Sequence, residues 1–197
     1  MPRPPRYDES ALLDAAVRLA AAGGPAAVTM SAVARESGAP NGSVYHRFPQ
    51  RAALLAELWL RTVEDFQADW LAALDSNPDD PSAAGALAAR RVVAWSRANP
   101  GPAAVLLHGA EAFGKAEWPG EYVRCERQGG RRVRKALAGL AERLGAGTAL
   151  DVDRIALAVV SLPLAVVRGH LRAGSPLPPH AEELAERCAL DLLAGAS

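Results

Sequence analysis

The residues best suited to chemistry lie in one polar stretch of this 197-residue chain, between Thr29 and Arg51. An asparagine side chain can pair with the edge of adenine, and serine, tyrosine and arginine can bind phosphates or bases. Both end residues stand at an expected helix start, where free N–H groups suit phosphate oxygens. These residue types together indicate DNA recognition. The candidate DNA-binding residues are Thr29, Asn41, Gly42, Ser43, Tyr45, His46, Arg47 and Arg51.

Three smaller residues, Ala34, Gly38 and Val44, are spaced to position these side chains. Two crossing helices need a small residue where they meet, which Ala34 supplies. The turn between them needs a residue that tolerates positive φ, which Gly38 supplies. Val44 then anchors the second helix, so the spacing predicts a helix-turn-helix whose second helix enters a major groove. In the alternative, three short helices merely pack together. In either case we expect Phe48 in the core.

The segment from residue 29 to residue 51 resembles the DNA-binding domain of the TetR/AcrR family of transcriptional regulators. The resemblance covers about the first 55 residues. The family pattern falls on Thr29, Val33-Ala34, Ser37-Gly38-Ala39-Pro40, Gly42-Ser43-Val44-Tyr45, Phe48 and Arg51. The chain departs from the pattern in three places: Ala20 replaces a usual Phe, Pro40 replaces a Ser cap, and His46-Arg47 replaces a Tyr/His pair. The resemblance implies DNA binding by this chain and leaves its operator sequence open.

Strong helix formers dominate the chain and alternating β-branched runs are absent, so we predict an all-α fold. Four helices are expected to start near residues 8, 30, 41 and 51, with the last ending near residue 74. The remaining helices are expected at 82–98, 102–113, 119–144, 151–173 and 179–194, separated by Gly- and Pro-bearing breaks. Pro163 should kink its helix, and Gly129-Gly130 should break or bulge another.

The resemblance implies two domains: a three-helix helix-turn-helix domain at 1–55, joined by a long helix to a ligand-binding and dimerisation domain at 56–197. It also implies a homodimer built by the last two helices, 151–173 and 179–194, whose wide apolar faces independently suit burial. A two-fold dimer would place its recognition helices on the two half-sites of a palindromic double-stranded operator. The most favoured function is a ligand-responsive repressor.

Aromatic residues cluster in the second predicted domain, which suggests a pocket for a small apolar effector. The same aromatic side chains could instead fill the core of alanine-rich helices, and the polar candidates could be ordinary surface groups. The candidate ligand-binding residues are Trp59, Phe66, Trp95, His108, Glu111, Phe113, Tyr122, Cys125 and Arg168. A further alternative keeps DNA binding but replaces the effector with a protein partner.

Several classes of protein are disfavoured by composition and motifs. The 22 basic and 22 acidic residues balance, so electrostatic binding needs a local patch. Residues 1–55 hold six arginines against four acids, a weak excess, and Arg3 and Arg6 could reach a minor groove or remain a solvated tail. Two distant cysteines imply no disulfide scaffold. The longest apolar run, at 155–167, is too short to cross a membrane. With no secretory signal, we expect a cytoplasmic protein without a membrane partner.

The search for catalytic motifs is negative, so we expect neither an enzyme nor a cofactor or metal site. No metalloprotease, paired-cysteine, phosphate-loop or nucleophile-elbow pattern is present. His108 and Glu111 are three residues apart on an expected helix, but a bundle-type metal site needs further inward ligands. The competing hypothesis is a small all-α enzyme or binding protein that uses its first three helices as scaffold.

Overall fold

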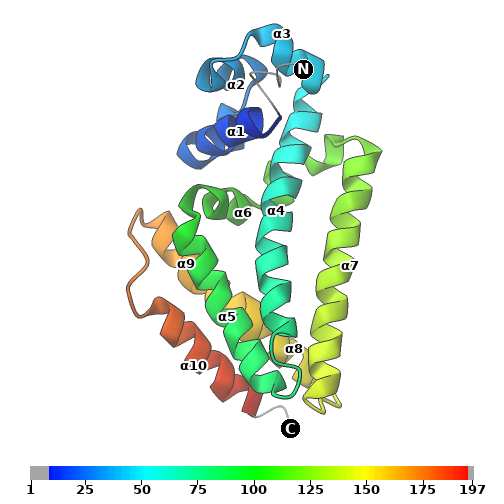
Figure 1. The fold of residues 1–197 in the computed structure, drawn as a ribbon, viewed down its shortest axis with the longest axis vertical. Coiled ribbons are helices and arrows are strands. Elements are labelled where there is room, and N and C mark those ends of the chain that lie inside the picture. The colour runs from blue at the N-terminus through cyan, green and yellow to red at the C-terminus, as the bar shows by residue number, and fades with distance from the viewer. Residues whose placement is uncertain (1–8, 195–197) are drawn as a thin grey trace, which may run out of the picture. The chain divides into compact units, whose positions relative to one another are not determined.

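The computed structural model describes residues 9–194, so Arg3 and Arg6 lie outside the described residues. Between residues 9 and 194 the chain is helical and contains no strand, which confirms the predicted fold class (Figure 1). The chain forms two compact units. The first unit comprises Met1–Val63 and Gly101–Arg127, and the second comprises Glu64–Pro100 and Gln128–Ser197. A functional boundary at residue 55 stays a prediction, because these units are defined by packing alone.

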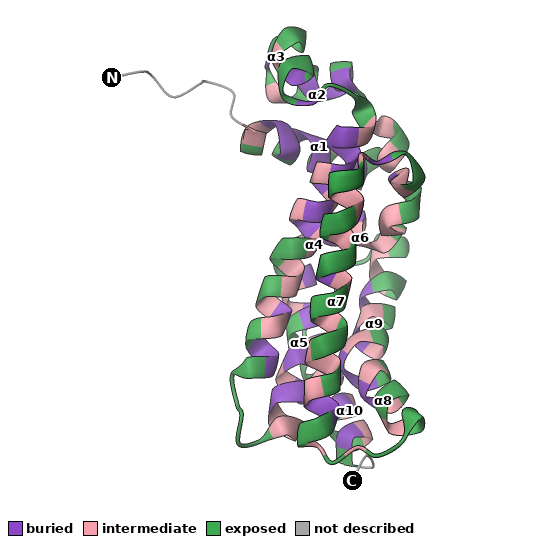
Figure 2. Ribbon diagram, turned by 90° about the vertical axis from the view of Figure 1, so that its right-hand side faces the viewer, coloured by how far each residue is buried: buried purple, intermediate pink, exposed green. Residues whose placement is uncertain are grey.

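Helix α1 (Glu9–Gly23) begins the first unit, followed by a short turn η1 (Pro25–Ala27), α2 (Met30–Ser37) and α3 (Asn41–Arg47). Helix α4 (Arg51–Asp75) contributes its first half to this unit. The apolar faces of these helices meet in one core, and Figure 2 colours their buried residues purple. Its largest fully buried members are Leu12, Leu13, Val28, Val33, Phe48, Leu54, Leu58 and Phe113. The prediction that Phe48 is a core residue is therefore confirmed.

Helix α6 (Pro100–Ala112), the turn η2 (Lys115–Glu117) and the start of α7 (Gly120–Arg143) complete the first unit. Gly109 interrupts α6 with φ 75° and ψ 158°, values that no helix contains. The chain therefore turns at this glycine, four residues before Phe113 enters the core.

Helix α5 (Pro81–Ala98) and helix α10 (Ala181–Ala194) form the closest packing of the second unit. The face of α10 toward the core carries small residues at one position per turn: Ala181, Ala185, Ala189 and then Leu193. On α5, a Cβ added to Gly85 would lie 2.7 Å from Leu193 Cδ1. Small residues therefore set the close approach of these two helices.

The predicted helix at 151–173 is three segments in the structure: α8 (Ala149–Ala156), a π-helical turn η3 (Leu157–Ser161) and α9 (Leu162–Arg172). Pro163 lacks an N–H and so cannot donate to the Val159 carbonyl four residues earlier. That carbonyl accepts a hydrogen bond from Trp70 Nε1 at 3.3 Å. The irregularity expected at Pro163 thus takes the form of a π-helical turn just before it.

The predicted break at Gly129-Gly130 is wrong, because α7 runs without interruption from Gly120 to Arg143. Glycine lowers helix propensity but leaves the backbone hydrogen bonds intact. Gly129 is buried, and a Cβ there would lie 3.1 Å from Gln67 Oε1. The absence of a side chain lets Gln67 approach α7 closely, whereas the neighbouring Arg131 and Arg132 are solvent-exposed.

Candidate nucleic-acid interface

The turn between α2 and α3 has the geometry that its sequence predicts. Thr29 caps α2, with its Oγ1 accepting a hydrogen bond from the Ala32 N–H at 3.1 Å. Gly38 ends α2 in the left-handed region, at φ 69° and ψ 14°. Ala34 and Val44 are both buried, so the two helices meet through them. Residues 29–44 therefore form a helix-turn-helix.

Two further contacts shape this turn. The Ser37 hydroxyl donates to the Val33 carbonyl at 2.7 Å and accepts from the Ala39 N–H at 3.4 Å. Helix α3 begins without a side-chain cap, since Pro40 has no side-chain oxygen to offer its first free N–H groups. The N-terminus of α3 consequently presents free backbone donors at Asn41 and Gly42, both of which are solvent-exposed.

Helix α3 separates its residues cleanly into an inner and an outer face. Val44 and the following Phe48 are buried in the core of the first unit. Tyr45 is 56% exposed despite being a large aromatic residue. His46 and Arg47 are also exposed, and Ser43 is half-buried. All candidate DNA-binding side chains of α3 can thus be reached from solvent, and their contact with DNA stays a prediction.

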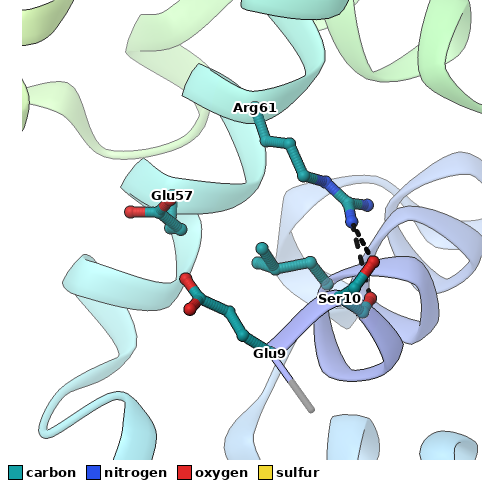
Figure 3. Close-up of a pocket in the computed structure, with 5 residues that line it drawn as sticks. Glu9, Ser10, Glu57 and Arg61 are labelled. Atoms are coloured by element: carbon teal, nitrogen blue, oxygen red, sulfur yellow. Dashed lines mark hydrogen bonds between the residues drawn. The ribbon is translucent and has the colours of Figure 1, made fainter.

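Arg47 lies at the C-terminal end of α3 and forms an ion pair with Glu9, the first residue of α1. Glu9 also lines an open cleft of about 360 Å³ between α1 and α4, together with Ser10, Leu13, Glu57 and Arg61 (Figure 3). The Arg61 guanidinium reaches Asp14 Oδ1 at 2.8 Å and Ser10 Oγ at 3.5 Å. No residue type or spacing in the sequence announced the contact between Arg47 and Glu9.

Arg51 makes contacts that the sequence did not predict. Its Nε donates to the Val28 carbonyl at 2.7 Å, and one terminal nitrogen donates to the Pro25 carbonyl at 2.7 Å. These bonds tie the start of α4 to the turn that precedes α2. Backbone carbonyls are available at every residue, so no sequence signal could have identified these two acceptors. A phosphate contact by Arg51 stays a prediction beside this structural role.

Tyr122, on the first turn of α7, belongs to the same charged surroundings. Burial raises the pKa of its phenol above the usual value, and Glu57 and Glu121 raise that pKa further. The Arg47 guanidinium opposes this rise in the pKa of Tyr122. The phenol therefore stays protonated and can donate a hydrogen bond to Glu57.

The candidate ligand-binding residues are divided between the two units. In the first unit, Phe113 is fully buried and Trp59 and Tyr122 pack against the core. In the second unit, the Phe66 and Trp95 rings meet edge-on at 5.2 Å. The polar candidates are all exposed: His108, Glu111, Cys125 and Arg168. Ligand contact by any of them stays a prediction.

Two buried polar atoms have no hydrogen-bond partner among the described residues: Trp59 Nε1 and Gln67 Oε1. The Trp59 ring packs at 5.8 Å from that of Trp118, whose own indole N–H donates to the Phe113 carbonyl. A buried donor or acceptor without a partner is costly, so each of these atoms needs a further hydrogen-bond partner. Gln67 was missed in the sequence, where an internal glutamine carries no signal of burial.

Within residues 9–194, no group of three or more histidine, cysteine, aspartate or glutamate residues could hold a metal ion. Glu111 contacts Lys115 at 3.8 Å, and His108 stacks edge-on with Phe113 at 6.3 Å between ring centres. None of the helices described is long and apolar enough to cross a membrane.

Comparison with known proteins identifies the first unit. Residues 12–58 match the family described as "Bacterial regulatory proteins, tetR family". No curated protein matches the chain by sequence.

Solved structures share the fold over nearly the whole chain. A TetR-like transcriptional regulator from Rhodococcus sp. RHA1 is 24% identical, with a TM-score of 0.70 over 99% of each chain. The ketosteroid transcriptional regulator of Mycobacterium tuberculosis is 19% identical, with a TM-score of 0.72 over 98% of this chain and 96% of that one. The fatty acid degradation regulator of Bacillus halodurans is 16% identical, with a TM-score of 0.71 over 96% of this chain and 100% of that one.

The family match falls on the helices that carry the helix-turn-helix, and the structural matches extend through both units. Residues 12–58 therefore match the TetR family, and the chain as a whole has the fold of solved TetR-family transcription regulators.

Proposed function

We propose that this protein is a transcription regulator that binds double-stranded DNA through the exposed face of α3. The observation that carries the proposal is the separation of that helix into buried anchors and an outer face of polar and aromatic residues. Tyr45 is more than half exposed. A tyrosine ring is large and mostly apolar, so it is usually more buried than this unless it serves to bind a partner. Because chromosomal DNA is the proposed partner, the protein acts in the cytoplasm.

The test is binding of the purified protein to a labelled duplex from the DNA flanking its own gene, measured by fluorescence anisotropy with excess competitor DNA. We expect saturable binding that survives competitor and weakens steeply as salt rises, because phosphate contacts release counterions. Should that duplex fail, selection from random duplexes supplies the probe. An inability to select any duplex would contradict the proposal.

The proposed regulator is a homodimer assembled through the second unit. Helix α10 carries a shallow outward groove lined by His180, Glu183, Leu184, Arg187, Cys188 and Asp191. Leu184 is 46% exposed within it, and Leu157 on η3 is similarly exposed. Arg187 and Asp191 lie one turn apart, so an antiparallel copy of α10 could pair each with the other's counterpart across a two-fold axis.

Leu184→Glu should shift the protein from dimer to monomer in analytical ultracentrifugation, since it places a charge in the centre of the proposed interface. The matched control is Leu150→Glu, at a more exposed leucine at the start of α8 that does not line the groove on α10. Equal effects of both substitutions would contradict this interface. A dimer would bind two half-sites about 34–36 Å apart or at multiples of that distance.

We further propose that an effector controls DNA binding, so that the protein acts as a ligand-responsive repressor. The unpartnered Trp59 Nε1 and Gln67 Oε1 support this proposal, because each could be satisfied by a polar atom of a ligand. Two regulators with this fold are named for ketosteroids and for fatty acid degradation, which favours an apolar effector.

A ketosteroid and a long-chain fatty acid are the first probes. Binding should quench tryptophan fluorescence and release the duplex, because only a ligand that prefers the DNA-free state can shift the equilibrium. Quenching without DNA release would contradict the regulatory role. If DNA binding changed only when a protein partner was added, that partner would take the place of the small effector in this proposal.

A further inference from the structure

The cation at the end of the recognition helix already has an anionic partner within the protein. The Arg47 guanidinium pairs with the Glu9 carboxylate, which projects from the first turn of α1. The Arg47 side chain nevertheless remains 53% exposed, and that of Glu9 32% exposed. An approaching anion can therefore reach the guanidinium without any movement of the helices.

The groups around Glu9 make Arg47 its principal cation. Arg61 is a cation that lines the same cleft, but its guanidinium is occupied by Asp14 Oδ1 and the oxygens of Ser10. Glu57 adds a second carboxylate, and Figure 3 shows both carboxyl groups turned toward the same cleft. If Arg47 left, Glu9 would face this cleft beside Glu57 without its ion-pair partner.

The position of Arg47 along α3 indicates which part of DNA it would meet. In helix-turn-helix proteins the N-terminal residues of the recognition helix contact base edges. Arg47 is the last residue of α3, so it is placed for the phosphate backbone rather than for the bases. Glu9 contacts one terminal nitrogen of the guanidinium, so a phosphate would compete with the carboxylate for that nitrogen and for the positive charge.

We propose that Glu9 is an internal competitor of DNA for Arg47. In the free protein the carboxylate holds the guanidinium, and on binding a phosphate oxygen displaces it. The inference rests on the proposed DNA-binding function and adds to it a residue outside the recognition helix that sets affinity. Because phosphate contacts carry no sequence information, Glu9 weakens binding to every duplex by a similar factor.

The experiment compares Glu9→Gln with wild type on two duplexes, the tightest one selected from a random pool and a scrambled duplex of equal length. Glu9→Gln should tighten binding to both by about two- to five-fold, the range expected for an exposed ion pair. The matched control is Asp14→Asn, which removes the same charge from the same helix but frees Arg61 rather than Arg47. It should produce a smaller change.

Combining Glu9→Gln with Arg47→Gln isolates the pair. In the Arg47→Gln background, Glu9→Gln should give no more than the small general effect of Asp14→Asn, because there is no guanidinium left to release. Weaker binding by Glu9→Gln, or a gain that persists without Arg47, would overturn the inference. Thermal unfolding of each variant identifies any that fail to fold.

A second readout needs no DNA. In the free protein, the NMR signal of the Arg47 Nε–H group should shift in Glu9→Gln and stay in place in Asp14→Asn. An unshifted signal would overturn the proposal that Glu9 competes with DNA for Arg47, even if DNA binds tightly. Failure of the wild type to bind either duplex overturns the proposed function instead, whatever this signal does.

Discussion

Helix α3 in the first unit and helix α10 in the second are both amphipathic, yet they are held in different ways. The seven-residue α3 depends on a left-handed glycine turn and on two large anchors, Val44 and Phe48. The fourteen-residue α10 lies against α5 through a row of alanines and the missing side chain of Gly85. Their outer faces differ too, with polar residues on α3 and exposed leucines on α10.

The strength of a sequence motif follows the kind of packing that it supports. A turn with a left-handed residue needs glycine at one position, so it leaves a sharp mark in the sequence. Close packing of alanines can be achieved by many sequences, so the contact between α5 and α10 leaves no sharp motif in the sequence. This difference explains why residues 12–58 match a family description while the second unit is related to known proteins through its fold.

The largest effect should come from filling the contact between α5 and α10. Gly85→Val places a branched side chain where even a Cβ would lie 2.7 Å from Leu193 Cδ1. We expect it to lower the free energy of unfolding by about 2–3 kcal/mol through overpacking, measured by urea denaturation. Gly139→Val is the matched control, because a Cβ there meets nothing within 4 Å. A similar loss in both variants would contradict close packing at Gly85.

A smaller loss in the free energy of unfolding is expected at Trp70, whose side chain donates a hydrogen bond to a backbone carbonyl of the second unit. Trp70→Phe keeps most of the buried ring but removes the indole N–H that serves the Val159 carbonyl. The free energy of unfolding should fall by about 1–2 kcal/mol. In a Pro163→Ala background the loss should shrink, because the restored backbone N–H can serve that carbonyl. A loss of the same size in both backgrounds would show that Trp70 acts through packing rather than through this hydrogen bond.

A single methyl group added at the turn between α2 and α3 should lower the free energy of unfolding. Gly38→Ala forces an alanine to φ 69° although a Cβ there would meet nothing within 4 Å. The expected loss is about 1 kcal/mol, entirely from the backbone conformation. Gly42→Ala is the control within α3, where the helical backbone accepts alanine and stability should rise slightly. A neutral Gly38→Ala would show that the turn does not depend on glycine.

The smallest effect concerns the start of α8. Thr148 and Asp151 form a reciprocal cap, in which each side chain accepts from the other's backbone N–H. Thr148→Ala should lower the free energy of unfolding by about 0.5 kcal/mol. Hydrogen bonds from Thr148 hold the pKa of Asp151 below its usual value. The stabilisation by Asp151 is thus present above the ordinary carboxyl pKa and is lost as pH falls through the lowered one. If the loss caused by Thr148→Ala did not change with pH, the Asp151 carboxylate would not contribute to this cap.

Most helix boundaries could be predicted, because glycine, proline and capping residues mark them directly. Residues 41–47 are one example, enclosed by Pro40 and Pro49. Gly129 could not be predicted correctly, since the same residue type breaks some helices and permits close packing in others. The π-helical turn before Pro163 contains the Val159 carbonyl, whose hydrogen bond comes from Trp70, a residue far away in the sequence.

Within the candidate site, residue type identified which side chains can reach solvent but not what else they contact. Arg47 and Arg51 were both predicted to meet DNA, and both already bind groups of the protein itself. Such partners are set by tertiary structure, so they leave no trace in local spacing. The same holds for the burial of the Trp59 and Gln67 polar atoms.

The most direct test of the central claim is the affinity of Tyr45→Ala for a duplex selected by the wild-type protein, with competitor DNA present. Tyr45 lies on the outer face of α3 and is 56% exposed, so its removal should leave unfolding and dimerisation unchanged. We expect a loss of specific affinity of about ten-fold or more, with little change in non-specific binding. Wild-type affinity in a folded Tyr45→Ala protein would contradict recognition through this face.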